Sequence, residues 1–131
     1  MAKTAAIFVA RLIFAGIFIM SSSMKFMGIN MTAQYIASVG FPLPLFLAWV
    51  AAFAEVALAF LSGAFFTEAA LAAGAYVLFL GVAFHGPAHW AGNPMEVGFF
   101  VDHFTFIAGL LFAAVNGPGQ KLAVSFRSRF S

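Results

Sequence analysis

Residues 43–63 read LPLFLAWVAAFAEVALAFLSG and contain a single charged side chain, that of Glu55. A helix needs about 20 mostly apolar residues to cross the hydrocarbon core of a bilayer. A run of this length with one charge therefore predicts a transmembrane helix over residues 43–63. Pro44 suits the first turn of that helix, because the N–H that proline lacks would have no partner there.

The composition of the whole chain also indicates a membrane protein. Of its 131 residues, 64% are hydrophobic and 8% are charged. A soluble chain of this size could not hide so much apolar surface from water. The net charge of +2 is too small to indicate binding to nucleic acid. The chain has no cysteine, which excludes disulfides, thiolate nucleophiles and sulfur-ligated metal centres.

Three more apolar segments predict helices over about residues 5–24, 68–85 and 97–115. The residues between Gly28 and Gly40 place apolar side chains at roughly helical spacing, which predicts a short helix on the outer membrane surface. The predicted fold class is all-α. We expect one transmembrane domain over residues 1–131, built as an antiparallel four-helix bundle.

The basic residues near the two ends predict the orientation of the chain. Lys3 precedes the first span, and Lys121, Arg127 and Arg129 follow the last. Basic residues favour the cytoplasmic side of a membrane, so both termini are predicted to be cytoplasmic. This orientation requires an even number of spans, and four spans satisfy it.

Two charged residues fall inside the predicted spans. Arg11 and Glu55 lie at similar predicted depth, and an unpaired charge in lipid is unfavourable by several kcal/mol. We therefore expect an ion pair between them. Such a pair could be a structural clamp between two helices, or it could line a site for a ligand head group or a proton path.

A second polar group is predicted at the outer interface. It consists of Lys25, His85, His89, Asn93, Glu96, Asp102 and His103. His85 and His89 have the spacing of two metal ligands on one helix face, but Gly86-Pro87 should break that helix. Asp102 and His103 are sequence neighbours, so they point about 100° apart on a helix.

This outer group leaves three interpretations open. The histidines could simply bond to backbone or lipid head groups, could exchange protons beside a quinone or another redox ligand, or could hold a metal. We predict no metal site. The candidate ligand-binding residues are Arg11, Lys25, Glu55, His85, His89, Asp102 and His103.

Several short motifs occur in a familiar order along the chain. They are Ala10-Arg11-Leu12, Gly16-Ile17-Phe18, Lys25-Phe26, Gly40-Phe41-Pro42, Glu55, His85 and Gly117-Pro118-Gly119. In order and spacing the chain resembles the DoxX family of small membrane proteins, from about Arg11 to Gly119. The resemblance implies a four-helix membrane fold, and it implies that Arg11, Lys25, Glu55 and His85 match the family's characteristic polar positions.

The resemblance also implies a functional setting. Family members are associated with quinone-linked respiration, including the membrane subunits of thiosulfate:quinone oxidoreductase and terminal quinol oxidase, and with oxidative-stress complexes. We therefore expect a multi-pass protein of a bacterial or archaeal inner membrane that serves quinone-linked electron transfer. Quinone is the expected ligand, with no covalent cofactor. Membrane lipid and either other redox subunits or further copies of the chain are the expected partners.

The sequence leaves open whether the chain is itself an enzyme. Without cysteine or a flavin motif, it is expected to act only as a subunit beside partner proteins. The alternative is a non-catalytic accessory subunit of a larger respiratory or photosynthetic membrane complex. A small transporter or lipid-handling protein ranks last, because the chain shows no inverted repeat.

Overall fold

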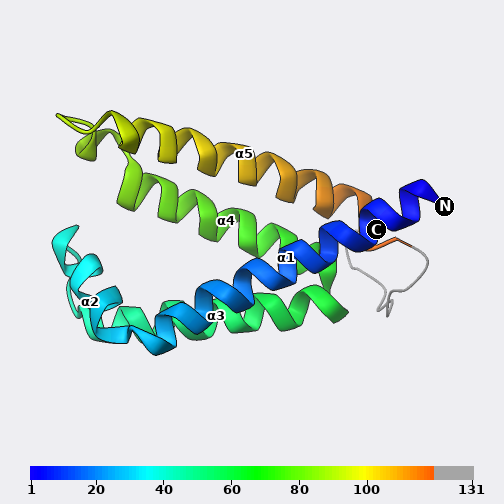
Figure 1. The fold of residues 1–131 in the computed structure, drawn as a ribbon, viewed down its shortest axis with the longest axis horizontal. Helices are drawn as coiled ribbons and strands as arrows, with labels where there is room; N and C mark the ends of the chain where they lie inside the picture. The colour runs from blue at the N-terminus through cyan, green and yellow to red at the C-terminus, as the bar shows by residue number, and fades with distance from the viewer. Residues whose placement is uncertain (120–131) are drawn as a thin grey trace.

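A computed structural model describes residues 1–119, and over that range the chain is helical with no strand (Figure 1). The elements are α1 (Ala2–Met27), α2 (Ile29–Ser38), α3 (Pro44–Ala64), α4 (Phe66–His85), a 3-10 turn η1 (Pro87–His89) and α5 (Pro94–Asn116). Within this range α1, α3, α4 and α5 are long and apolar enough to cross a membrane. The predicted all-α class and the four predicted spans are confirmed.

The observed helices extend three of the predicted spans by a few residues, and α3 is shifted by one residue from the predicted span 43–63. The shortest predicted span, over residues 68–85, lies in α4, whose 20 residues extend about 30 Å. That length is enough to cross the hydrocarbon core. Helix α5 ends at Asn116 because Gly117 takes a positive φ of 69°, a conformation that glycine adopts without strain.

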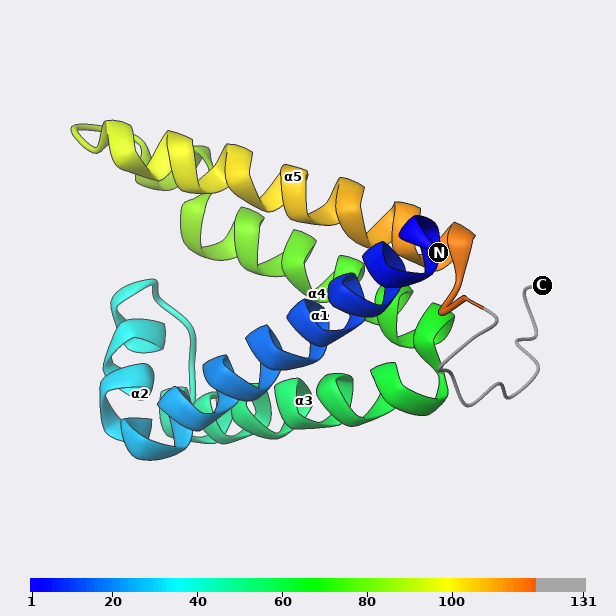
Figure 2. The same cartoon turned by 45° about the vertical axis from the view of Figure 1, so that its right-hand side comes forward.

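The long helices pack as two pairs. Helix α1 lies along α3, and α4 lies along α5, while the short turn between α3 and α4 joins the pairs. The pairs meet near that turn and separate toward the opposite end of the molecule (Figures 1 and 2). The arrangement is therefore a splayed bundle, in which space remains between the pairs at one end.

The converging end of the bundle is packed around small side chains of α4. Ala69, Ala70 and Ala73 are buried there against Phe14 of α1 and Leu58 of α3. Ala114 of α5 completes the cluster. Because alanine side chains are small, they let the backbones of neighbouring helices approach closely, which is how helices associate when lipid removes the hydrophobic drive.

Helix α2 lies across the open end of the bundle (Figure 2). It begins after the break at Gly28, which confirms the short helix expected between Gly28 and Gly40. Its buried face, Ala33 and Ile36, packs on Ala48 of α3, and Phe84 of α4 joins this cluster. The helix therefore spans from one helix pair to the other and covers the space between them.

The first and last described residues lie at the same end of the molecule. Gly119 sits beside the side chain of Ile7 in α1. This placement agrees with an even number of crossings. Three of the basic residues used to predict the orientation, Lys121, Arg127 and Arg129, lie outside the described residues, so the cytoplasmic location of the termini stays a prediction.

Candidate ligand-binding cleft

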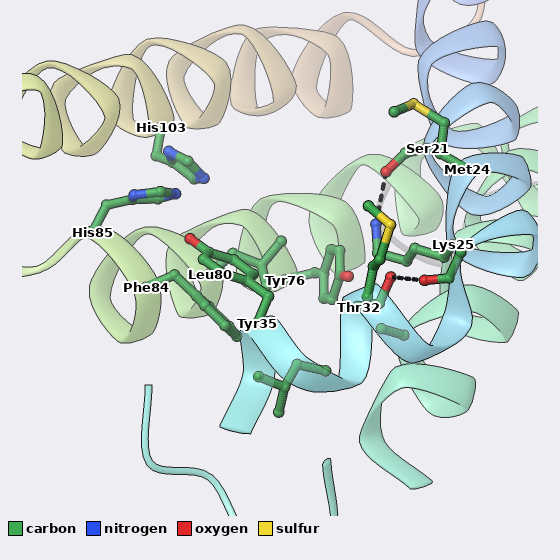
Figure 3. A pocket seen from close by; sticks show the side chains of 14 residues that line it. Ser21, Met24, Lys25, Thr32, Tyr35, Tyr76, Leu80, Phe84, His85 and His103 are labelled. Carbon is green, nitrogen blue, oxygen red and sulfur yellow. Dashed lines mark hydrogen bonds between the residues drawn. The ribbon is translucent and has the colours of Figure 1, made fainter. Parts of the chain in front are cut away.

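A cleft of about 420 Å³ occupies the space between the two helix pairs (Figure 3). Its lining comes from all five α-helices of the described chain. Apolar side chains predominate, with polar groups at particular places. The lining residues are Ser21, Met24, Lys25, Gly28, Met31, Thr32, Tyr35, Ile36, Ala51, Tyr76, Leu80, Phe84, His85 and His103.

A buried ion pair lies at one end of the cleft. Lys25 Nζ is 2.9 Å from both carboxylate oxygens of Glu55, and it also donates to Ser21 Oγ at 2.8 Å. The Glu55 side chain is 4% exposed and that of Lys25 is 22% exposed. Lys25 lies near the end of α1, yet its side chain runs back beside Ser21, toward the middle of the helix. Attraction to the Glu55 carboxylate explains this direction, because an unpaired carboxylate in lipid would be unfavourable.

Tyr76 of α4 completes the network. Its hydroxyl donates to Glu55 Oε1 at 2.8 Å, so the carboxylate connects α1, α3 and α4. Lysine and glutamate cancel each other's charge. This end of the cleft therefore offers polar atoms without a net charge, which suits a neutral polar ligand better than an ion.

The predicted ion pair between Arg11 and Glu55 is wrong. Arg11 precedes Lys25 by roughly four helical turns, about 21 Å along the axis of α1. An arginine side chain cannot cover that distance while Lys25 contacts Glu55. The depth estimate failed because α1 continues to Met27 and pairs with α3 so that the C-terminal end of α1 meets the middle of α3.

Two histidines lie at the opposite end of the cleft. The rings of His85 and His103 have their centroids 5.0 Å apart, and Figure 3 shows them side by side with the hydroxyl of Tyr35 reaching toward them. His85 Nδ1 lies 2.6 Å from Glu96 Oε2 at the start of α5. His103 Nδ1 lies 2.7 Å from the carbonyl oxygen of Phe99. Each ring is therefore held through Nδ1.

Glycine at position 81 permits the close approach of α4 and α5 behind His103. A Cβ atom on Gly81 would lie 3.0 Å from Cβ of His103 and 3.2 Å from its Cγ. These distances are shorter than ordinary carbon–carbon contacts. The position of His103 in the cleft therefore depends on a glycine one helix away.

A second, more polar cavity of about 340 Å³ lies beside the cleft. Tyr35 and Phe84 line both cavities, and their rings stack with centroids 5.3 Å apart. Glu96 and His89 line the second cavity only. Partial burial, and then the nearby negative charge of Glu96, raise the pKa of Tyr35 above its ordinary value of 10.0. The two cavities therefore meet at the Tyr35–Phe84 pair, and His85 and Glu96 join across the same boundary.

The remaining predicted site residues lie elsewhere. His89 is directed to the carbonyl oxygen of Ala83 at 3.0 Å and does not line the cleft. Asp102 is exposed, whereas its neighbour His103 faces the cleft, as expected for consecutive helix positions. Arg11 is likewise absent from the cleft lining. Within residues 1–119, no group of three or more His, Cys, Asp or Glu side chains is arranged to hold a metal.

Sequence reasoning missed three members of the site. Tyr76 and Tyr35 line the cleft and Gly81 packs against His103, but none of the three carries a charge that would distinguish it in the sequence of an apolar helix. Trp90 also supports the site, because its indole N–H donates to the carbonyl oxygen of His85 at 2.8 Å, at the end of α4. For Tyr76 a signal existed, because it carries a polar group in the middle of a predicted span.

Comparison with known proteins gives two matches. The DoxX family profile matches residues 6–86, which include Lys25, Glu55, Tyr76 and His85. The chain is also 32% identical over 123 residues to "Inner membrane protein YphA" of Escherichia coli (strain K12). That alignment covers 90% of this chain and 87% of the relative. No solved structure gives a significant match.

Proposed function

This chain belongs to the DoxX family of multi-pass membrane proteins, and on that premise we propose that its cleft binds a quinone in the service of quinone-linked electron transfer. The proposed setting is an inner membrane, as the name of the Escherichia coli relative suggests. The proposed partners are other membrane redox subunits, because the chain has no cysteine and its described part offers no metal centre that could accept electrons.

The observation that supports this proposal is the polarity pattern of the cleft. Ligand sites in proteins typically have volumes of about 300–1,000 Å³ and combine an apolar lining with a few placed polar groups. The cleft has about 420 Å³, mostly apolar walls, and polar groups at two ends. A quinone ring is apolar on its faces and carries a hydrogen-bonding oxygen on each of two opposite edges, so it matches such a pattern.

Charge favours a neutral ligand over an anionic lipid. The ammonium group of Lys25 is already matched by Glu55, at 2.9 Å. A phosphate or fatty acid carboxylate in the cleft would compete with Glu55 and leave one anion without a partner, which is unfavourable at low dielectric. A quinone accepts hydrogen bonds without adding charge.

The direct test is a binding titration with short-chain ubiquinone and menaquinone analogues. The protein is purified in lipid nanodiscs, and binding is followed by quenching of tryptophan fluorescence. Ala51→Phe places a ring in the cleft without removing a polar group, since Ala51 lines the cleft. Ala57→Phe adds the same ring to an exposed position of α3 and is the matched control.

We expect the analogues to bind the wild-type protein and the Ala57→Phe variant alike. Ala51→Phe should weaken binding by roughly tenfold or more, equivalent to at least about 1.4 kcal/mol. Equal affinities for all three proteins would place the quinone outside the cleft and contradict the proposal. A wild-type protein that binds no quinone analogue would favour the accessory-subunit hypothesis instead.

A further inference from the structure

Glu96 and His85 form a direct link between the cleft and the second cavity. His85 lines the cleft, Glu96 lines the second cavity, and the two side chains are joined by the 2.6 Å contact between Nδ1 and Oε2. Tyr35 and Phe84, whose rings stack, line both cavities. The hydrogen-bonded pair therefore joins a residue of the cleft to a residue of the second cavity.

The contact with Glu96 sets the tautomer of His85. A carboxylate only accepts hydrogen bonds, so Nδ1 of His85 must carry the hydrogen when Glu96 is ionised. In neutral His85 the other ring nitrogen, Nε2, is then an acceptor on the far side of the ring from Glu96. An imidazole held in this way can take a proton at Nε2 and release one at Nδ1.

We propose that His85 and Glu96 are a proton relay from the cleft to the second cavity; this rests on the proposed quinone site. A hydroxyl proton of a bound quinol moves to His85 Nε2, and its bonding electrons stay on the quinol oxygen. The Nδ1 proton of His85 moves to the Glu96 carboxylate and then to water in the second cavity. On full oxidation the quinol loses two electrons, which pass to a protein electron acceptor. It also loses two protons, and the relay carries the proton that faces His85.

The surroundings of the relay are consistent with this path. His103 of α5 stands beside His85, and Tyr35 of α2 lines the cleft together with His85 and the second cavity together with Glu96. His89 also lines the second cavity. The second cavity lies where the α4–α5 loop and the end of α2 meet. Because its lining is more polar than that of the cleft, it suits water better than an apolar ligand.

The test is time-resolved infrared difference spectroscopy on the protein with a bound ubiquinol analogue, where a potential step at an electrode removes the electrons and the spectra are recorded while the protons leave. The quinone carbonyl bands report the ligand, and a carboxylic acid band that shifts in D₂O reports a carboxylate gaining a proton. We expect both signals in the wild-type protein. Glu96→Gln should abolish the carboxylic acid band while the quinone bands persist, because Glu96 lines only the second cavity.

Asp102→Asn is the matched control, because it removes an exposed carboxylate from the same helix. It should leave both signals unchanged. A carboxylic acid band that survives in Glu96→Gln, or disappears in Asp102→Asn, would overturn the relay and leave the proposed quinone site intact. Absence of quinone bands in the wild-type protein would overturn both proposals.

Discussion

Lys25 and Glu55 are separated by 30 positions in the sequence, yet Lys25 Nζ lies 2.9 Å from both oxygens of the Glu55 carboxylate. This contact joins the C-terminal end of α1 to the middle of α3. Lys25 also lines the cleft, and the Glu55 carboxylate that it contacts is almost completely buried. The ion pair therefore joins two helices and, through Lys25, contributes to the lining of the cleft.

The first prediction concerns this ion pair. Lys25→Leu should lower the free energy of unfolding by about 3 kcal/mol or more, because it leaves the Glu55 carboxylate buried without a counter-charge. The double variant Lys25→Leu/Glu55→Leu should recover much of that loss, since no buried charge remains. Thermal unfolding in detergent measures the three proteins. A double variant that is less stable than Lys25→Leu would contradict the structural pairing.

The second prediction concerns the Tyr76 hydroxyl. Tyr76→Phe removes a hydrogen bond to a charged acceptor and should destabilise the protein by about 2 kcal/mol. In the Lys25→Leu/Glu55→Leu background the same change should be neutral or stabilising, because the hydroxyl has then lost its acceptor. Thermal unfolding in both backgrounds checks the change of sign. An equal loss in both backgrounds would mean that Tyr76 acts through packing alone.

The third prediction concerns the glycine behind His103. Gly81→Ala should push His103 and α5 outward by a few tenths of an ångström and destabilise the protein by about 1–2 kcal/mol. It should also weaken binding of the quinone analogue. Gly74→Ala is the control on the same helix, where the added atom meets only an ordinary contact at 4.0 Å. That control should be neutral or slightly stabilising, because alanine favours helix. Similar losses in the two variants would show that α4 and α5 do not need this close approach.

The fourth prediction concerns the titration of Tyr35. Its pKa is raised by partial burial and by Glu96, so Tyr35 should ionise at higher pH than an exposed tyrosine. The folded state then holds this proton more tightly than the unfolded state. The stabilising contribution is therefore present below pH 10 and is lost as the pH rises through the folded-state pKa.

Tyrosinate absorbance, taken as the difference between the wild-type protein and Tyr35→Phe, isolates this titration. Glu96→Gln should move the transition toward the ordinary value, because it removes one of the two causes of the shift while leaving the burial in place. A transition unaffected by Glu96→Gln would show that Glu96 does not act on Tyr35, and would weaken the placement of both residues around the second cavity.

The sequence by itself determined the fold class and the number of long apolar helices. Run length and charge content decide whether a segment can lie in lipid, and these are local properties, as residues 43–63 show. The short helix after Gly28 was predictable for the same reason, from periodicity between two glycines. Several site residues, among them Lys25, Glu55, His85 and His103, were predictable because an ionisable group in a membrane span needs a partner or a task.

Only the tertiary structure decided which of these residues meet. The partner of Glu55 is Lys25 and not Arg11, because the axial offset between α1 and α3 is set by packing along the whole helix pair and not by the ends of either span. The same holds for His85, whose link to Glu96 and proximity to His103 depend on how α4 packs against α5. Hydropathy limits the depth at which a residue lies in the membrane. The neighbours of that residue are decided by the rotation and axial offset between helices, and both follow from side-chain packing across the chain.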